Sequence, residues 1–230
     1  KTSQPVSLEQ AEKIYEKLLN SKISKGYSLG EISQQKFSHI PTPKKIHKSP
    51  QLLNMVFTTS EFINDNSYLA QEKRDGERRM VVSDSKSTIG LNKKGQEVPL
   101  PNNIVDSLNG KCIIDGEIIG DTLYAFDILS LSGQDLEGEP CIERIAILNE
   151  LSFGSGIIVV ETAYNTEEKQ EMFDKLEREN REGIVFKKKD APYTYGRPSS
   201  GGTQLKFKFY KTATFIVANH TPGKRSVGLE

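Results

Sequence analysis

Short runs of β-forming residues follow one another from Leu52 onward, and this succession constrains the fold more than any other feature of the sequence. The runs predicted as strands are residues 68–72, 79–83, 113–119, 123–129, 157–161, 183–186 and 205–209. Two helices interrupt them, at residues 142–151 and 166–179, where apolar residues recur at intervals of three and four. So few helices argue against a doubly wound parallel sheet, and the sequence therefore predicts an α+β fold with antiparallel sheets.

The two ends of the chain follow other patterns and indicate a division into four segments. Residues 1–27 contain a predicted helix at 8–21, with Ser7 and Gln10 placed as a capping box. Residues 28–50 hold prolines and lysines in the pattern of an extended basic connector. The main domain then spans residues 51–211. Residues 212–230 begin a further element, with a strand predicted at 214–219.

Composition excludes several classes of protein. A chain of 230 residues can bury a core without disulfides or metal, and a mean hydropathy of -0.52 is that of an ordinary soluble domain. Thirty-one Lys and Arg balance thirty-one Asp and Glu, which excludes a globally basic surface for nucleic acid but leaves a local basic groove open. No apolar run approaches the roughly 20 residues of a membrane helix, and no signal peptide is visible. The two cysteines are too few for a secreted disulfide framework, so we expect a cytoplasmic protein, nucleoid-associated if bacterial, and the three scattered histidines show no metal-ligand spacing.

The segment QEKRDGER, residues 71–78, carries the clearest chemical signal. It places Lys73 at the end of an apolar strand, before a tight turn, with Arg78 five residues further on. A purely structural alternative is a hairpin turn in which Asp75 and Gly76 supply the positive φ and the charges are solvated. This segment alone does not decide between a nucleophilic lysine and such a turn.

Four further segments add charged and aromatic residues in order along the chain. Glu117 ends one buried strand and Glu182 begins another, while Phe126 lies within an apolar strand between them. Lys206 and Lys208 are two residues apart on a strand, which directs both toward one face of the sheet. In isolation these residues are typical of salt bridges, core packing and solvated strand lysines.

Taken together, the five segments resemble the motifs of the covalent nucleotidyltransferases, most closely the adenylation domain of ATP-dependent DNA ligases. The resemblance covers about residues 52–211 and implies two antiparallel sheets, with flanking helices, facing each other across a nucleotide cleft. It also implies that Lys73 attacks the α-phosphorus of ATP, releases pyrophosphate and holds AMP through a phosphoramidate bond. A lysine amine attacks only when neutral, so partial burial, neighbouring cations and Mg²⁺ are expected to lower the pKa of a nucleophilic lysine.

The resemblance also assigns roles to individual residues. Lys206 and Lys208 would contact the α-phosphate and act with Lys73 in catalysis. Glu117 would accept a hydrogen bond from a ribose hydroxyl, and Glu182, with Glu117, would hold Mg²⁺ directly or through water, since this ion takes few protein ligands. Phe126 would stack on adenine. The remaining residues expected to bind the nucleotide are Gln71 near the adenine amino group, Arg78 on the ribose or nick side, Glu72, Lys93 and Lys187.

One position departs from the family pattern. DNA ligases usually have Ser-Arg after the next hairpin, where this chain has Asn92 and Lys93. A lysine supplies the charge but lacks the bidentate fork that arginine offers a phosphate, which bears on how a 5′-phosphate is held. The ends resemble other modules of the same enzymes: residues 1–27 the closing helix of a WGR-like DNA-binding domain, and residues 212–230 the start of an OB-fold domain.

The sequence thus predicts the adenylation domain of an ATP-dependent DNA ligase, a monomer without a membrane partner that seals 5′-phosphate/3′-hydroxyl nicks in duplex DNA. ATP and Mg²⁺ are the expected cofactors, with AMP as the covalent intermediate. An RNA ligase or a capping-type nucleotidyltransferase shares the lysine chemistry and stays open as an alternative. So does a noncatalytic module that binds nicks or nucleotides, whose DNA binding would fall steeply with salt.

Overall fold

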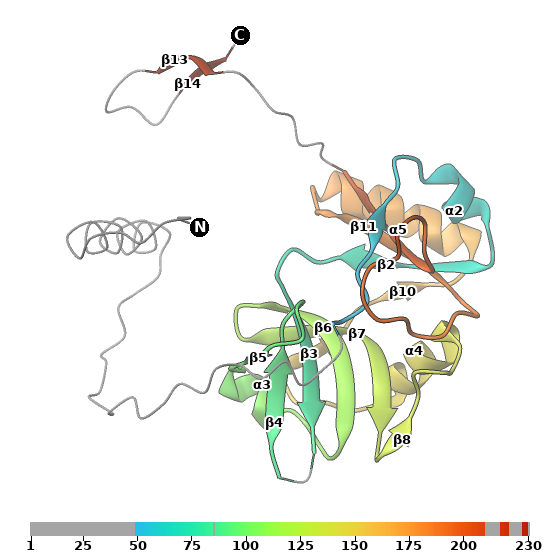
Figure 1. Ribbon diagram of the computed structural model, residues 1–230. Coiled ribbons are helices and arrows are strands. Elements are labelled where there is room, and N and C mark those ends of the chain that lie inside the picture. Colours follow the sequence, from blue (N-terminus) through green and yellow to red (C-terminus); the bar gives the residue numbers. More distant parts are fainter. Residues whose placement is uncertain (1–48, 85, 210–216, 221–226, 230) are drawn as a thin grey trace. The chain divides into compact units, whose positions relative to one another are not determined.

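The computed structural model describes residues 49–84, 86–209, 217–220 and 227–229, and its elements are drawn in Figure 1. The predicted helix at residues 8–21 and nearly all of the basic connector lie outside the described residues. Within them, the chain forms two main sheets and a separate pair of short strands, β13 (Val217–His220) and β14 (Val227–Leu229). No helix in the described part of the chain is long and apolar enough to cross a membrane.

The five-stranded sheet carries the predicted lysine strand near its centre. Its order is β1 (Asn54–Met55), β12 (Gln204–Lys208), β11 (Gly183–Lys188), β2 (Tyr68–Lys73) and β10 (Thr162–Ala163), all antiparallel except the β1–β12 pair. One face packs against helices α2 (Ser60–Asn64) and α5 (Thr166–Arg178) through Ala70, Ile184, Phe186, Met172 and Leu176. The side chain of Asn165 caps α5 by accepting a hydrogen bond from the backbone N–H of Glu168. Apolar residues alternate with polar ones along these strands, so the opposite face is left polar.

The seven-stranded sheet forms the other half of the domain. Its order is β5 (Glu97–Val98), β4 (Thr88–Leu91), β3 (Glu77–Ser83), β6 (Cys112–Ile119), β7 (Thr122–Leu131) and β8 (Gln134–Asp135), while β9 (Ile157–Val159) pairs in parallel with β7. Helices α3 (Asn102–Asp106) and α4 (Cys141–Glu150) complete this half, whose main core contains Val81, Ile104, Ile114, Leu123, Ile128 and Leu148. The predicted α+β fold with two sheets and few helices is confirmed, with one parallel strand pair added in each sheet.

The chain passes from one sheet to the other between Lys73 and Glu77. β2 belongs to the five-stranded sheet and β3 to the seven-stranded sheet, and the two strands do not pair with each other. The alternative that Asp75 and Gly76 form a hairpin turn is therefore wrong. Gly76 is not among the described residues with positive φ; a Cβ there would lie 2.3 Å from the carbonyl oxygen of Ile118. Glycine is needed for this close approach rather than for its freedom of φ.

A bulge in β7 changes which side chains share a face. The register with β6 shifts between the pairs Asp115–Asp127 and Gly116–Ala125, which leaves Phe126 as an extra residue. Strict alternation along β7 would place Phe126 on one face with Ile128. Instead Ile128 joins Ala125 in the core, while Phe126 faces the polar side between the sheets.

Candidate active site

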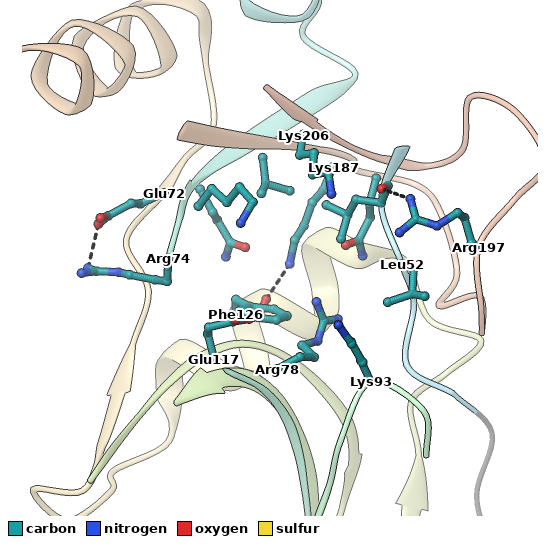
Figure 2. Close-up of a pocket in the computed structure, with 15 residues that line it drawn as sticks. Leu52, Glu72, Arg74, Arg78, Lys93, Glu117, Phe126, Lys187, Arg197 and Lys206 are labelled. Atoms are coloured by element: carbon teal, nitrogen blue, oxygen red, sulfur yellow. Dashed lines mark hydrogen bonds and ion pairs between the residues drawn. The ribbon is translucent and has the colours of Figure 1, made fainter. Parts of the chain in front are cut away.

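A pocket of about 290 Å³ lies where the polar faces of the two sheets meet, and Figure 2 shows its lining. The five-stranded sheet and the seven-stranded sheet both contribute side chains to it. The lining residues include nine of those predicted from the sequence: Gln71, Glu72, Lys73, Arg78, Lys93, Glu117, Phe126, Lys187 and Lys206. Lys208 and Glu182 do not line this pocket but contact each other beside Lys73.

Strand register explains how the lysines come together. Lys73 in β2 lies opposite Gly183 in β11, and Gly183 lies opposite Lys208 in β12. A second row two residues away joins Gln71, Val185 and Lys206 in the same order. Because residues two apart share a face, both rows project toward the same side of the sheet.

Glu182 holds two of the lysines. Its Oε2 atom lies 2.5 Å from Nζ of Lys73, and its Oε1 atom lies 2.8 Å from Nζ of Lys208. Burial would raise the pKa of Glu182, but the hydrogen bonds from Lys208 and Lys73 outweigh it and lower this pKa. We expected positive charge to surround the Lys73 amine; its direct neighbour is a carboxylate, and the cations lie beyond it.

Lys206 differs from Lys73 and Lys208 because no partner for its ammonium group is found among the described residues. Burial lowers the pKa of Lys206, and repulsion from Lys73, Arg197 and Lys208 lowers it further, with Glu182 opposing. An ammonium group without a counter-ion at the wall of a pocket is suited to binding an anion.

The seven-stranded sheet supplies the opposite wall. Arg78 donates from Nε and Nη2 to the two carboxylate oxygens of Asp115, at 2.7 and 2.6 Å. The Tyr193 hydroxyl also donates to Asp115. This buried carboxylate therefore holds the guanidinium group of Arg78 in position at the pocket wall. The guanidinium group of Arg78 lies 4.5 Å from the centre of the Phe126 ring, which limits the positions that ring can take.

Glu117 lies beside Arg78 on the paired strand β6. Burial raises the pKa of Glu117 to about 7, although the positive charges of Arg78 and Lys73 oppose the shift. Glu117 lines the pocket, so its carboxyl group titrates near neutral pH at the pocket wall.

Gln71 presents a hydrogen-bond acceptor to the pocket. Its Nε2 donates to Oγ1 of Thr162 at 2.9 Å, while its buried Oε1 has no partner among the described residues. The Thr162 hydroxyl donates in turn to the carbonyl of Val160, at 3.4 Å. Because that hydroxyl proton is directed away from Gln71, the threonine oxygen acts as the acceptor, and the amide keeps its nitrogen toward Thr162.

The other predicted nucleotide-binding residues occupy different parts of the lining. Lys187 is buried, and its ammonium group donates to the carbonyl of Phe126 at 2.8 Å, which joins the two sheets across the pocket. Burial lowers the pKa of Lys187. Glu72 pairs with Arg74 at 2.8 Å, and Arg74 lies over the ring of Tyr124 at 4.4 Å.

Several lining residues were not predicted from the sequence. Arg74 follows Lys73, and Val185 lies two residues before Lys187 on β11, so their spacing from predicted residues could have indicated them. No comparable signal points to the others, which come from a loop or from strands whose partners are distant in sequence: Leu52, Leu53, Arg197 and Gln204.

The described residues contain no group of three or more His, Cys, Asp or Glu side chains placed to hold a metal ion. The two acids expected to serve Mg²⁺ are Glu117 and Glu182, and each oxygen of Glu182 already accepts from an ammonium group. Glu117 has no ion pair among the described residues, so these acids fit only an ion that takes one or two carboxylates and fills its remaining positions with water and phosphate oxygens.

A polar pocket between two such sheets, with a lysine at a strand end, also occurs in a fold found among solved DNA ligases. The mycobacterial DNA ligase D solved in complex with ATP and MES has this fold, with a TM-score of 0.58, 19% identity, and coverage of 71% of this chain and 61% of that one. Residues 121–208 match the family model described as ATP dependent DNA ligase domain.

Curated proteins also match parts of this chain. A probable DNA ligase of Dictyoglomus turgidum is 39% identical over 87 residues, which are 36% of this chain and 15% of that protein. A probable DNA ligase of Beutenbergia cavernae is 32% identical over 104 residues, 45% of this chain and 20% of that protein. The matched part of the chain thus spans a fifth or less of the length of these relatives.

Proposed function

We propose that this domain transfers AMP from ATP to Lys73 and serves the sealing of 5′-phosphate/3′-hydroxyl nicks in duplex DNA. One observation carries the proposal: Lys73 lines the pocket with its amine in hydrogen-bond contact with Glu182, and on the same sheet face lies Lys206, whose ammonium group has no ion pair within the described residues. In the transfer, Nζ of Lys73 bonds to the α-phosphorus as the bond to the β-phosphate oxygen breaks, and pyrophosphate leaves. Glu182 is an acceptor for the proton that the amine must lose.

Cations on this sheet face stabilise the charge that develops on the phosphate. Lys206 is available for the α-phosphate, because its ammonium group has no hydrogen bond or ion pair in the described structure and lies among other cations. Lys208 shares Glu182 with Lys73 and would approach the phosphate when that carboxylate moves. Fixed positive groups contribute more as the transferring phosphate gains charge than in the ground state.

The lining of the pocket favours adenine as the base. The unpartnered Oε1 of Gln71 can accept from the amino group of adenine, whereas guanine presents a carbonyl oxygen at the corresponding ring position. The Phe126 ring and the Val185 side chain supply apolar surfaces from opposite sheets, suited to the faces of a base. Glu117 is then left for a ribose hydroxyl, with Arg78 beside it.

Mg²⁺ would be held by Glu117 and Glu182 together with ATP oxygens and water. When bound, it would supply positive charge at the triphosphate.

A second pocket, of about 450 Å³, adjoins the first and supports a nucleic-acid acceptor. The two pockets share Arg78, Lys93 and Glu117, and the second also contains Lys94. No ion pair of Lys93 or Lys94 is found in the described part of the chain. These lysines are placed to bind phosphates of the strand whose 5′ end would receive AMP.

Labelling with α-³²P-ATP and Mg²⁺ tests the proposed transfer. The expected result is label on Lys73 that is acid-labile, absent in Lys73→Met and retained in Lys86→Met, which removes an exposed lysine at the far end of the β3–β4 hairpin. Because residues 212–230 are proposed to begin an OB-fold domain, the same assay is repeated with that domain supplied in trans. Absence of label under both conditions would contradict the proposal.

Donor and acceptor comparisons separate the alternatives. A DNA ligase should prefer ATP to GTP and transfer AMP to nicked DNA rather than to nicked RNA. Preference for GTP would indicate a capping-type enzyme, and preference for nicked RNA an RNA ligase. Salt-sensitive binding of nicked DNA without a Lys73 adduct would indicate a noncatalytic module. Sedimentation of the chain with and without DNA tests the proposed monomer.

A further inference from the structure

Arg197 is a cation at the nucleotide pocket that the proposed transfer has not used. It belongs to the loop between β11 and β12 and lines the same pocket as Lys73 and Lys206. In Figure 2 it lies on the opposite side of the drawn pocket from Glu72 and Arg74. The side chain is exposed, so a ligand in the pocket could reach it without any change of the core.

One edge of the Arg197 guanidinium group is anchored by the backbone. Its Nη1 donates to the carbonyl of Leu53 at 2.6 Å and lies 3.4 Å from Oδ1 of Asn54. Asn54 is itself fixed, because its Nδ2 donates to the carbonyls of Pro198 and Gly201 at 3.0 and 2.9 Å. Nε and Nη2 of Arg197 have no partner among the described residues, so the other edge can bind an anion bidentately.

The charges around Arg197 favour an anion. Glu182 neutralises part of the charge of Lys73 and Lys208, but no carboxylate in the described structure pairs with Lys206 or Arg197. The repulsion that Lys206 experiences from Arg197 and Lys73 shows that these cations act on the same region of the pocket. Because both residues line the pocket, an extended polyphosphate offers each of them an anionic group.

We propose that Arg197 binds the β- and γ-phosphates of ATP and stabilises pyrophosphate as it leaves. This inference rests on the proposed AMP transfer to Lys73. As the nitrogen–phosphorus bond forms at Lys73, the bond between the α-phosphorus and the oxygen shared with the β-phosphate breaks, and the electron pair goes to pyrophosphate. The amine proton passes to Glu182 or to water. Arg197 then compensates charge at the opposite end of the reaction from Lys73.

Equilibrium binding separates this role from a general effect on the pocket. The dissociation constants of α,β-methylene-ATP, which cannot transfer AMP, and of AMP are measured for the wild type and for Arg197→Ala, Arg197→Lys and Arg178→Ala. Arg178→Ala removes an exposed arginine from α5, on the other face of the five-stranded sheet. We expect Arg197→Ala to weaken α,β-methylene-ATP by about 10- to 100-fold and AMP by less than about twofold, with Arg197→Lys intermediate and Arg178→Ala unchanged.

Other outcomes would overturn the proposal. If Arg197→Ala weakens the binding of both nucleotides equally, Arg197 serves to position the backbone at Leu53 rather than to bind phosphate. If it weakens the binding of neither, Arg197 is not part of the nucleotide site. Loss confined to nicked DNA with a 5′-phosphate would assign it to the acceptor. Thermal melting of each variant verifies folding. Absence of a Lys73 adduct in the wild type would defeat the proposed transfer but not this test, because the affinity ratio needs no reaction.

Discussion

Nζ of Lys73 lies 2.5 Å from Oε2 of Glu182, and the other oxygen of the same carboxylate binds Lys208. The relationship places the proposed nucleophile against an acid rather than among cations. An ion pair orients the amine and offers a route for its proton, while in the proposed transfer Lys206 and Arg197 would supply positive charge to the phosphates. Positioning and charge compensation are thus divided between different residues.

Glu182→Gln tests this division by removing the acid and keeping the side-chain size. We expect the rate of Lys73 adenylation to fall by about 100-fold, because the amine loses its oriented proton acceptor and Lys208 loses its partner. Single-turnover labelling with α-³²P-ATP measures the rate. Glu161→Gln, which affects an exposed pair with Lys175, is the matched control and should retain the wild-type rate. A rate unchanged in Glu182→Gln would remove this acid from the reaction.

The same variant should change the acid stability of the domain. The pKa of Glu182 is lowered in the folded state, so its contribution to the free energy of unfolding is present above the ordinary value of 4.5 and is lost as pH falls through the lowered pKa. The difference in stability between wild type and Glu182→Gln should therefore be largest near neutral pH and shrink in acid. Urea unfolding at several pH values measures it. A difference that grows in acid would contradict the assigned direction.

Glu117 should affect stability in the opposite sense. Its folded pKa of about 7 lies above the ordinary 4.5, so the folded state binds a proton that the unfolded state releases between these values. The stability of the wild type relative to Glu117→Gln should fall by about 1–2 kcal/mol as pH rises from 4 to 8. Denaturant unfolding in EDTA, which excludes metal binding, checks this. Parallel pH profiles of the two proteins would show that Glu117 does not titrate in this range.

Gln71→Leu should reduce selectivity for the base. The substitution removes the acceptor facing the pocket, so ATP affinity should fall by about 10-fold while the weaker GTP affinity changes little. Gln71→Glu keeps an acceptor and should retain the preference for adenine. Binding of the α,β-methylene analogues of both nucleotides gives the ratio. Equal losses for the two bases in Gln71→Leu would place Gln71 outside base recognition.

Gly183→Ala should disrupt the site by forcing the backbones of β11 and β12 apart. A Cβ at Gly183 would lie 2.0 Å from the carbonyl oxygen of Phe207, so β11 must separate from β12 at the pair that brings Glu182 to Lys208. We expect a loss of about 2–4 kcal/mol in the free energy of unfolding, together with loss of adenylation. Gly138→Ala is the control, because a Cβ there has no atom within 4 Å. Equal stability of the two variants would show that the strands accommodate the added methyl group.

Particular residues show how far the sequence could predict the site. The spacing of Lys206 and Lys208 predicts that they share one strand face. The structure places Lys208 in the row of Lys73 and Lys206 in the row of Gln71. Strict alternation failed for Phe126 and Ile128, because an extra residue in β7 shifts the register and no local pattern signals it. Arg197 was missed because a loop has no periodicity to read, and its position depends on the carbonyl of Leu53, 144 residues away.

By itself, the sequence determined the strand-rich class of the domain, the order of its charged motifs and the faces on which closely spaced residues lie. These are local properties, set by side-chain periodicity and by the chemistry of each residue type. Only the tertiary structure decided that the chain crosses between sheets after Lys73, that Glu182 joins Lys73 to Lys208, and that Arg197 reaches the pocket. Such arrangements depend on strand pairing and backbone contacts between distant segments, whose energies no short stretch of sequence contains.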